Sequence, residues 1–125
     1  MYVSAVRRAI LLNHKVVKPE NAKVVKKPLY MLHGVLGSIS NFMSHARKIS
    51  DRCGCEVVLS DARNHGSSEH TQTMSYTDMV EDLEMLCKSL GHDDINLLGH
   101  SMGGRTAMAT ALGTELVDKL DFFKK

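Results

Sequence analysis

Short apolar runs alternate with longer amphipathic stretches along this chain. Residues 29–32, 56–60 and 95–98 are apolar through most of their length, and each run stops at a polar loop that contains glycine. Runs of this length and composition indicate buried strands. Because helix-forming stretches separate them, the pattern predicts an α/β fold, with a mostly parallel sheet and helices on both faces.

The best-marked helix is expected over residues 76–90. Ser75 at the N-cap and Asp78 at the third helical position form a capping box, and Gly91 closes the helix. Apolar residues recur at helical spacing, at Met79, Leu83, Leu86 and Leu90. This face is therefore predicted to pack in the core.

Two further helices are expected, over residues 41–52 and 104–116. Asn41 is a suitable cap for the first of them, and Gly54 follows its end. The second begins directly after a glycine-containing turn.

A basic N-terminal segment is expected over residues 1–27. Two pieces rich in β-branched residues, 9–18 and 22–27, flank a turn at Pro19 and predict an antiparallel hairpin. The stretch 1–19 contains no Asp or Glu but carries the basic side chains of Arg7, Arg8, Lys15 and Lys18. Such a start resembles a mitochondrial targeting sequence. The segment is thus either a targeting sequence or the first hairpin of a cytoplasmic domain, and it is not a secretory signal.

Composition narrows the classes of function. The 125 residues suit one domain, and a net charge of +2 is too small to indicate nucleic-acid binding. No apolar stretch approaches the roughly 18 residues that a membrane-spanning helix needs. The three cysteines give no disulfide framework, and Cys53 and Cys55 lack the second ligand pair of a zinc site. No metal is therefore expected.

The sequence Gly99-His-Ser-Met-Gly103 carries the candidate chemistry. It lies between a predicted strand and a predicted helix, a context in which Gly-x-Ser-x-Gly is typical of a nucleophile elbow. Ser101 is the candidate nucleophile, and the backbone N–H of Met102 is expected to point at the oxyanion that forms during attack. Such acyl transfer needs no cofactor.

A second glycine-containing loop, His33-Gly-Val-Leu-Gly-Ser38, follows the strand 29–32. Its glycines allow a main-chain N–H to turn toward Ser101 as the second oxyanion donor. Val35 is the expected donor and Leu36 the alternative. His33 is expected to hold the loop rather than to carry a proton.

The loop after residue 60 is rich in turn-forming residues. Asp61 and His65 within it suggest a triad with Ser101. Both residues lie on one loop, however, and His65 would have to reach across it to the serine. This triad is therefore not expected.

Taken together, three motifs resemble the α/β-hydrolase superfamily. They are His33-Gly34, Asp61-Ala-Arg-Asn-His-Gly66, and Gly99-His-Ser-Met-Gly-Gly104 with Thr106-Ala-Met108 after it. They are similar to the abhydrolase-domain-containing protein 11 group and to bacterial esterases. The resemblance makes residues 28–125 the N-terminal half of an α/β-hydrolase domain. It implies a serine hydrolase that cleaves carboxylic esters, acylglycerols included, through an acyl-serine intermediate, and a mitochondrial location in animals.

The same resemblance implies residues that this sequence lacks. In the superfamily the triad acid and histidine follow the serine along the chain. No histidine follows Ser101, and Glu115, Asp118 and Asp121 come too early to match the acid. We therefore expect a form truncated after the elbow helix and nearly inactive alone. Truncation leaves an open sheet edge at 95–98, which a protein partner would cover.

Two other functions fit parts of the sequence. A truncated isoform or pseudoenzyme would act as a non-catalytic binding module. Residues 99–106 are also one residue from a phosphate-binding P-loop, with Arg105 where lysine is required. Nucleotide binding is thus a minor alternative, and a small-molecule or lipid ester is the expected ligand.

Overall fold

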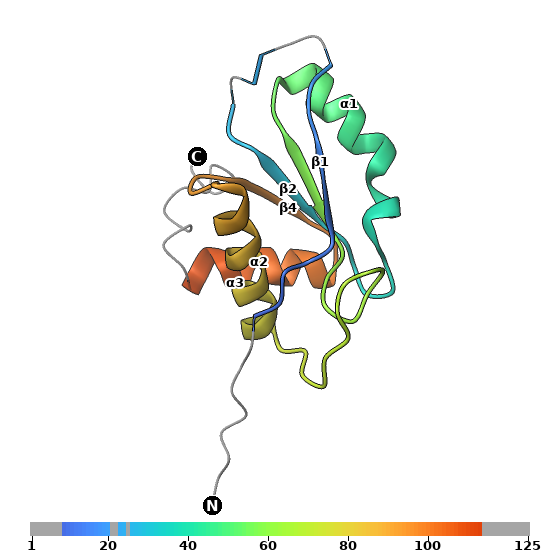
Figure 1. Ribbon diagram of the computed structural model, residues 1–125, viewed down its shortest axis with the longest axis vertical. Helices are drawn as coiled ribbons and strands as arrows, with labels where there is room; N and C mark the ends of the chain where they lie inside the picture. The colour runs from blue at the N-terminus through green and yellow to red at the C-terminus, as the bar shows by residue number, and fades with distance from the viewer. Residues whose placement is uncertain (1–8, 21–22, 25, 114–125) are drawn as a thin grey trace, which may run out of the picture.

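The computed structural model describes residues 9–20, 23–24 and 26–113 (Figure 1). Residues 1–8 of the predicted targeting segment, which include Arg7 and Arg8, lie outside the described residues, and so do the three acids beyond residue 113. Within the described part, no helix combines the length and apolar character needed to cross a bilayer.

Within the described residues, four strands form one mixed sheet in the order β1-β3-β2-β4. They are β1 (His14–Val17), β2 (Leu29–Leu32), β3 (Val57–Ser60) and β4 (Asn96–Gly99). The strands β2, β3 and β4 are mutually parallel, whereas β1 runs antiparallel to β3. The predicted α/β fold with a mostly parallel sheet is confirmed, and β4 forms one edge of it.

The predicted N-terminal hairpin is wrong. β1 pairs with β3, with Lys15 opposite Leu59, rather than with residues 22–27. Among the described residues of that stretch, none is in a strand. The stretch carries three lysines, so it offers little apolar surface to a partner. Pairing with the fully buried β3 instead places Val17 in the core.

Helices cover both faces of the sheet, as predicted (Figure 1). α1 (Met43–Cys53) packs on one face, and α2 (Tyr76–Leu90) and α3 (Met102–Gly113) pack on the other. Alternate strand residues face opposite sides. The core under α2 and α3 contains Tyr30, Leu32, Val58 and Leu97, and the core under α1 contains Met31, Val57 and Leu59.

The helix α2 begins and ends where the sequence predicts. The Ser75 hydroxyl accepts the Asp78 N–H at 3.0 Å, and the Asp78 carboxylate accepts the Ser75 N–H at 2.9 Å. Gly91 ends the helix in the left-handed region, with φ 71°. These caps satisfy terminal backbone groups that have no partner within the helix.

The first helix begins later than predicted. A single 3-10 turn, η1 (Ile39–Asn41), precedes α1 and is capped by Ser38. Asn41 lies inside this turn, where its side chain accepts the Ser38 N–H at 2.7 Å, so it does not cap α1. Gly54 ends α1 with φ 64°, as expected. The helix α3 begins at Met102, two residues earlier than predicted, and residues 114–116 lie outside the described part.

Candidate active site

The carboxyl ends of the three parallel strands meet at one edge of the sheet. Leu32 of β2 lies opposite both Ser60 of β3 and Gly99 of β4. Among the described residues, those other than glycine with a positive φ are Leu36 (62°), Asn64 (63°) and Ser101 (54°). One of them follows each parallel strand. Such backbone costs roughly 1–3 kcal/mol per residue and collects at functional sites, so this edge is the candidate active site.

Ser101 lies in a tight turn between β4 and α3. The His100 N–H donates to the Leu32 carbonyl at 3.0 Å, which ties the turn to the end of β2. The Arg105 N–H donates to the Ser101 carbonyl, also at 3.0 Å, at the start of α3. Ser101 itself is exposed. The strand-turn-helix context predicted for this pentapeptide is therefore present.

Three glycines bring the neighbouring backbones close to Ser101. A Cβ on Gly99 or on Gly103 would overlap a backbone carbonyl group. A Cβ on Gly34 would lie 2.9 Å from His100 Nδ1 and 3.3 Å from Ser101 Cβ. Loop 33–37 thus lies directly against the turn that carries the serine, as the spacing of the motifs predicts.

Some main-chain N–H groups of the Ser101 turn and of loop 33–37 are free to donate a hydrogen bond, and others are already engaged. Within the described part of the chain, no hydrogen bond engages the N–H of Met102 or of Val35. The Leu36 N–H is already engaged, because it donates to His65 Nε2 at 3.1 Å. Of the two donors that the sequence offers on this loop, Val35 is therefore the available one. An open depression of about 470 Å³ lies between this loop and Ser101.

His33 holds the loop, in agreement with its predicted structural role. Its Nδ1 donates to the Gly34 carbonyl at 2.7 Å, and its Nε2 accepts the Ala62 N–H at 3.0 Å. The residue is only 3% exposed. Burial lowers the pKa of His33, partly opposed by the hydrogen bond to Gly34. With both nitrogens engaged, this ring has no free site for a serine proton.

Asp61 and His65 do not form a triad with Ser101. The buried Asp61 carboxylate accepts three hydrogen bonds, from the N–H groups of Ile39 and Ser67 and from the side-chain amide of Asn13. Burial alone would raise the pKa of Asp61, but these hydrogen bonds hold it below its usual value. His65 Nδ1 contacts the Arg63 carbonyl at 2.9 Å while Nε2 accepts from Leu36. Neither side chain is directed to the serine by a hydrogen bond.

Residues 27–120 match the family described as alpha/beta hydrolase fold. The chain belongs to the α/β-hydrolase family. It is 47% identical over 94 residues to the sn-1-specific diacylglycerol lipase ABHD11 of Danio rerio, covering 74% of this chain and 30% of that protein. The Mus musculus protein of the same name is 48% identical over 84 residues, covering 67% of this chain and 27% of its own length. The predicted resemblance is thus confirmed.

Solved structures of esterases share the fold. A marine microorganism esterase superimposes with a TM-score of 0.76 at 40% identity, covering 90% of this chain and 40% of the esterase. A thermophilic esterase from Thermogutta terrifontis gives a TM-score of 0.74 at 26% identity, covering 87% and 37%. The chain therefore spans less than half the length of these relatives.

One feature of this α/β-hydrolase chain that the sequence pattern did not reveal is a buried ion pair. Arg63 Nε donates to Asp82 Oδ2 at 2.7 Å and its Nη2 donates to Oδ1 at 2.8 Å, and each side chain is 1% exposed. The Asp82 carboxylate raises the pKa of Arg63, against the effect of burial. The available signal was an acid among the apolar positions of α2, which requires a buried partner.

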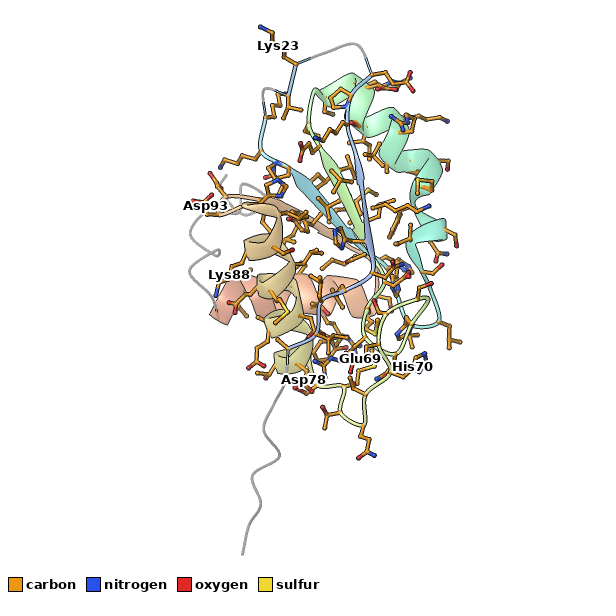
Figure 2. The ribbon with its side chains drawn as sticks, in the orientation of Figure 1. Lys23, Glu69, His70, Asp78, Lys88 and Asp93 are labelled. Carbon is orange, nitrogen blue, oxygen red and sulfur yellow. The ribbon has the colours of Figure 1, made fainter. Side chains whose placement is uncertain are left out.

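This ion pair fastens the loop after β3 to α2. Figure 2 shows the loop that carries Glu69 and His70 beside the start of α2, which is marked by Asp78. Arg63 Nη1 lies 3.7 Å from the Asp78 carboxylate and donates to the Thr73 carbonyl at 3.0 Å. The loop that contains His65 is therefore anchored to the core through Arg63.

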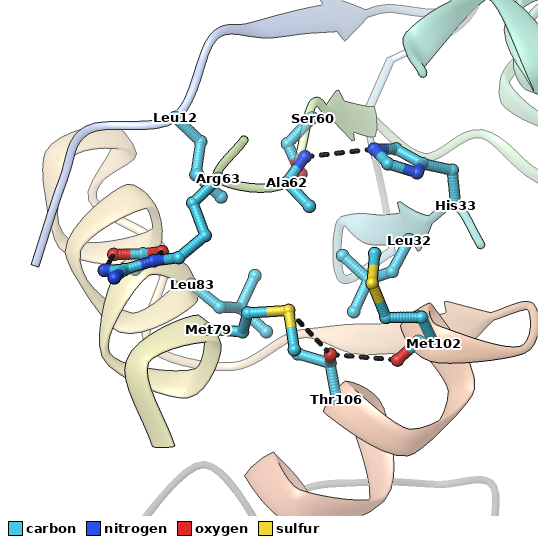
Figure 3. Close-up of a pocket in the computed structure, with 12 residues that line it drawn as sticks. Leu12, Leu32, His33, Ser60, Ala62, Arg63, Met79, Leu83, Met102 and Thr106 are labelled. Carbon is cyan, nitrogen blue, oxygen red and sulfur yellow. Dashed lines mark hydrogen bonds and ion pairs between the residues drawn. The ribbon is translucent and has the colours of Figure 1, made fainter. Parts of the chain in front are cut away.

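A small cavity lies behind the elbow, between Arg63, His33 and Met102 (Figure 3). Its volume is about 30 Å³. This is space for a water molecule or two, and an ester does not fit. Ser101 lines the open depression and is not among the residues that line this cavity.

The position of Thr106 counts against nucleotide binding. Its hydroxyl donates to the Met102 carbonyl at 3.0 Å and approaches the Met79 sulfur at 3.7 Å (Figure 3). The residue is 5% exposed. In a P-loop the corresponding hydroxyl faces a phosphate-bound metal ion, whereas here it is buried between α2 and α3.

Proposed function

We propose that Ser101 is the nucleophile of a serine hydrolase that cleaves carboxylic esters, and that the N–H groups of Met102 and Val35 stabilise the oxyanion. The observation that carries this proposal is the strained turn of Ser101, with φ 54°, packed against Gly34 of the preceding loop. Diacylglycerol is the first substrate to test, because the diacylglycerol lipases of Danio rerio and Mus musculus are 47% and 48% identical to this chain over the matched residues.

The reaction proceeds in two halves. Ser101 Oγ attacks the carbonyl carbon of the ester while a base takes the hydroxyl proton, and the π electrons move to the carbonyl oxygen. That oxygen accepts hydrogen bonds from Met102 and Val35, and the start of α3 adds the positive end of its dipole. Collapse of the tetrahedral intermediate breaks the bond to the leaving oxygen, which takes the proton back from the base and departs as the alcohol, and leaves an acyl-Ser101. Water then attacks this ester and releases the acid.

We propose further that the base and acid are not among these 125 residues. All seven histidines precede Ser101, and none is hydrogen-bonded to its hydroxyl within the described residues. His33 and His65 are each engaged at both ring nitrogens. A serine without its base loses several orders of magnitude in rate, so residues 1–125 alone act as a truncated form with little activity.

The outer edge of β4 supports a second proposal. Within the described residues, β4 pairs on one side only, with β2. Its unpaired N–H and C=O groups form a template for another strand. We propose that a strand from a further segment or from a protein partner pairs there. A non-catalytic binding module would use the same edge of β4. Only a test of activity therefore distinguishes a serine hydrolase from such a module. The mitochondrial location stays a prediction.

The deciding test is hydrolysis of a p-nitrophenyl ester and of diacylglycerol by the natural protein that carries this sequence. We expect Ser101→Ala to lower the rate by at least about 1,000-fold. Ser89→Ala is the matched control, because Ser89 is exposed at the end of α2 and its hydroxyl donates to the Leu86 carbonyl of the same helix. Unchanged hydrolysis by Ser101→Ala would overturn the proposal. Inactivity of the unaltered protein would favour the binding module.

A further inference from the structure

Leu36 adopts a backbone conformation that its own side chain does nothing to stabilise. Its φ is 62°, in the left-handed region that favours glycine, and its side chain is 93% exposed. It occupies the third position of the turn 34–37, which the Gly37 N–H closes on the Gly34 carbonyl at 3.0 Å. Turns with a positive φ at this position usually have glycine there. Something outside the turn therefore holds Leu36.

The holding contact is His65. Its Nδ1 donates to the Arg63 carbonyl at 2.9 Å, so that Nε2 is left as the acceptor for the Leu36 N–H at 3.1 Å. Arg63 is in turn fixed by its buried ion pair with Asp82 of α2. A continuous series of contacts thus runs from α2 through Arg63 and His65 to the turn. The His33 ring packs beside the His65 ring, and the two ring centroids are 5.2 Å apart.

We propose that His65 is a positioning residue for the oxyanion-stabilising turn, acting through the Leu36 N–H. The inference rests on the proposed function of Ser101 and Val35. A flip of the peptide between Val35 and Leu36 would bring Leu36 to a negative φ and relieve its strain. The flip would also exchange the Leu36 N–H for the Val35 carbonyl opposite His65. Because Nε2 is an acceptor, it attracts the N–H and repels the carbonyl, and so holds the peptide between Val35 and Leu36 in place. The Val35 N–H belongs to the preceding peptide, and its position beside Ser101 depends on the turn that this contact keeps rigid.

Two substitutions at one position separate this role from general stability. His65→Asn keeps a side-chain N–H for the Arg63 carbonyl but removes the acceptor for Leu36. His65→Gln reaches farther and returns an amide oxygen to the position of Nε2. Both lose the imidazole ring and its packing beside His33. The measurements are kcat and KM for a p-nitrophenyl ester, and the affinity for a trifluoromethyl ketone that mimics the tetrahedral intermediate.

We expect His65→Asn to lower kcat and ketone affinity by about 10- to 100-fold, with KM changed less than about threefold, since loss of one oxyanion donor outright costs about 100-fold or more. His65→Gln should retain most of the activity. A second change, Leu36→Gly in the His65→Asn protein, should recover much of the loss, because glycine adopts a positive φ without strain.

Equal losses in the Asn and Gln variants, or an unchanged kcat in His65→Asn, would overturn the inference while the proposed function stands. Absence of recovery by Leu36→Gly would overturn it as well, even where His65→Asn folds poorly. An unaltered protein that hydrolyses no ester would instead overturn the proposed function, and with it this inference.

Discussion

The backbone nitrogen of His100 lies 3.0 Å from the carbonyl oxygen of Leu32. This one hydrogen bond joins the turn that carries Ser101 to the strand that leads into loop 33–37. The two motifs lie far apart in the sequence, and parallel pairing of β2 with β4 brings them into register. The pairing of these two strands therefore sets where the serine and the start of the loop lie relative to each other.

Crowding at Gly34 should impair activity more than stability. A Cβ there would lie 2.9 Å from His100 Nδ1 and 3.3 Å from Ser101 Cβ, so Gly34→Ala should displace the serine or the loop. Displacement of reacting groups by tenths of an ångström to an ångström lowers kcat by about 10- to 100-fold. Gly113→Ala is the control, since no atom of the described residues lies within 4 Å of its Cβ position. Equal activity of the two variants would show that the loop does not abut the serine.

Ser101 should carry backbone strain that glycine relieves. Its φ of 54° is costly for any residue with a Cβ, so Ser101→Gly should unfold with a free energy roughly 1 kcal/mol higher than Ser101→Ala. Both variants lack the hydroxyl, and the comparison therefore isolates the backbone. Urea denaturation measures the difference. A lower stability for the glycine variant would mean that the turn is not strained.

The Arg63–Asp82 pair should be among the most sensitive positions in the core. Asp82→Asn leaves the Arg63 charge buried with a weaker partner, and breaking a buried pair costs about 3–5 kcal/mol. Glu69→Gln on the same loop changes an exposed acid and should alter the free energy of unfolding by less than about 0.5 kcal/mol. Thermal or urea unfolding measures the stabilities of Asp82→Asn and Glu69→Gln against that of the unaltered protein. Similar stabilities would contradict the structural role given to Arg63.

Acid should destabilise the fold in two windows. The pKa of His33 is lowered from 6.5 by burial, so between 6.5 and the folded value the unfolded chain binds more protons. Stability is therefore complete above this window and falls as the pH drops through it. The pKa of Asp61 is lowered from 3.8, since its hydrogen bonds outweigh burial, and a second loss follows below that value.

The unfolding free energy, measured from about pH 7.5 down to about pH 5, tests the His33 part. A His33→Gln protein lacks this titration and should show a flatter dependence in that range. If the two proteins lose stability in parallel, the buried imidazole is not the cause.

Local signals in the sequence predicted part of this structure well. The caps of α2 depend on residues three positions apart, and the elbow depends on a pentapeptide. The pairing of β1 with β3 joins segments that are distant in the sequence, and it has no local signal. Asn41 failed as a cap for a related reason. Several polar residues near Asn41 are equally suited to cap a helix. The Asp61 carboxylate, from a distant loop, accepts the Ile39 N–H at 2.8 Å and so stabilises the 3-10 turn that contains Asn41.

The candidate site divides in the same way. Ser101, Met102 and Val35 follow from motif and spacing, and their roles stay predictions. What the sequence does not show is that the Leu36 N–H is already engaged, by His65 from another loop, 29 residues away. Arg63 lies in a loop rich in turn-forming residues, and only the fold brings it to Asp82. Polar contacts between residues far apart in the chain follow no periodicity or fixed spacing in the sequence, so a sequence pattern does not predict them.

Covalent trapping of Ser101 tests the central claim most directly. A fluorophosphonate probe is added to a native lysate that contains the natural protein, and the labelled protein is digested with trypsin. Cleavage after Lys88 and Arg105 releases residues 89–105, which contain Ser89 and Ser101. We predict that fragmentation of this peptide finds the phosphonate on Ser101. A protein that hydrolyses esters but carries the label on another residue, or none on this peptide, would contradict the account.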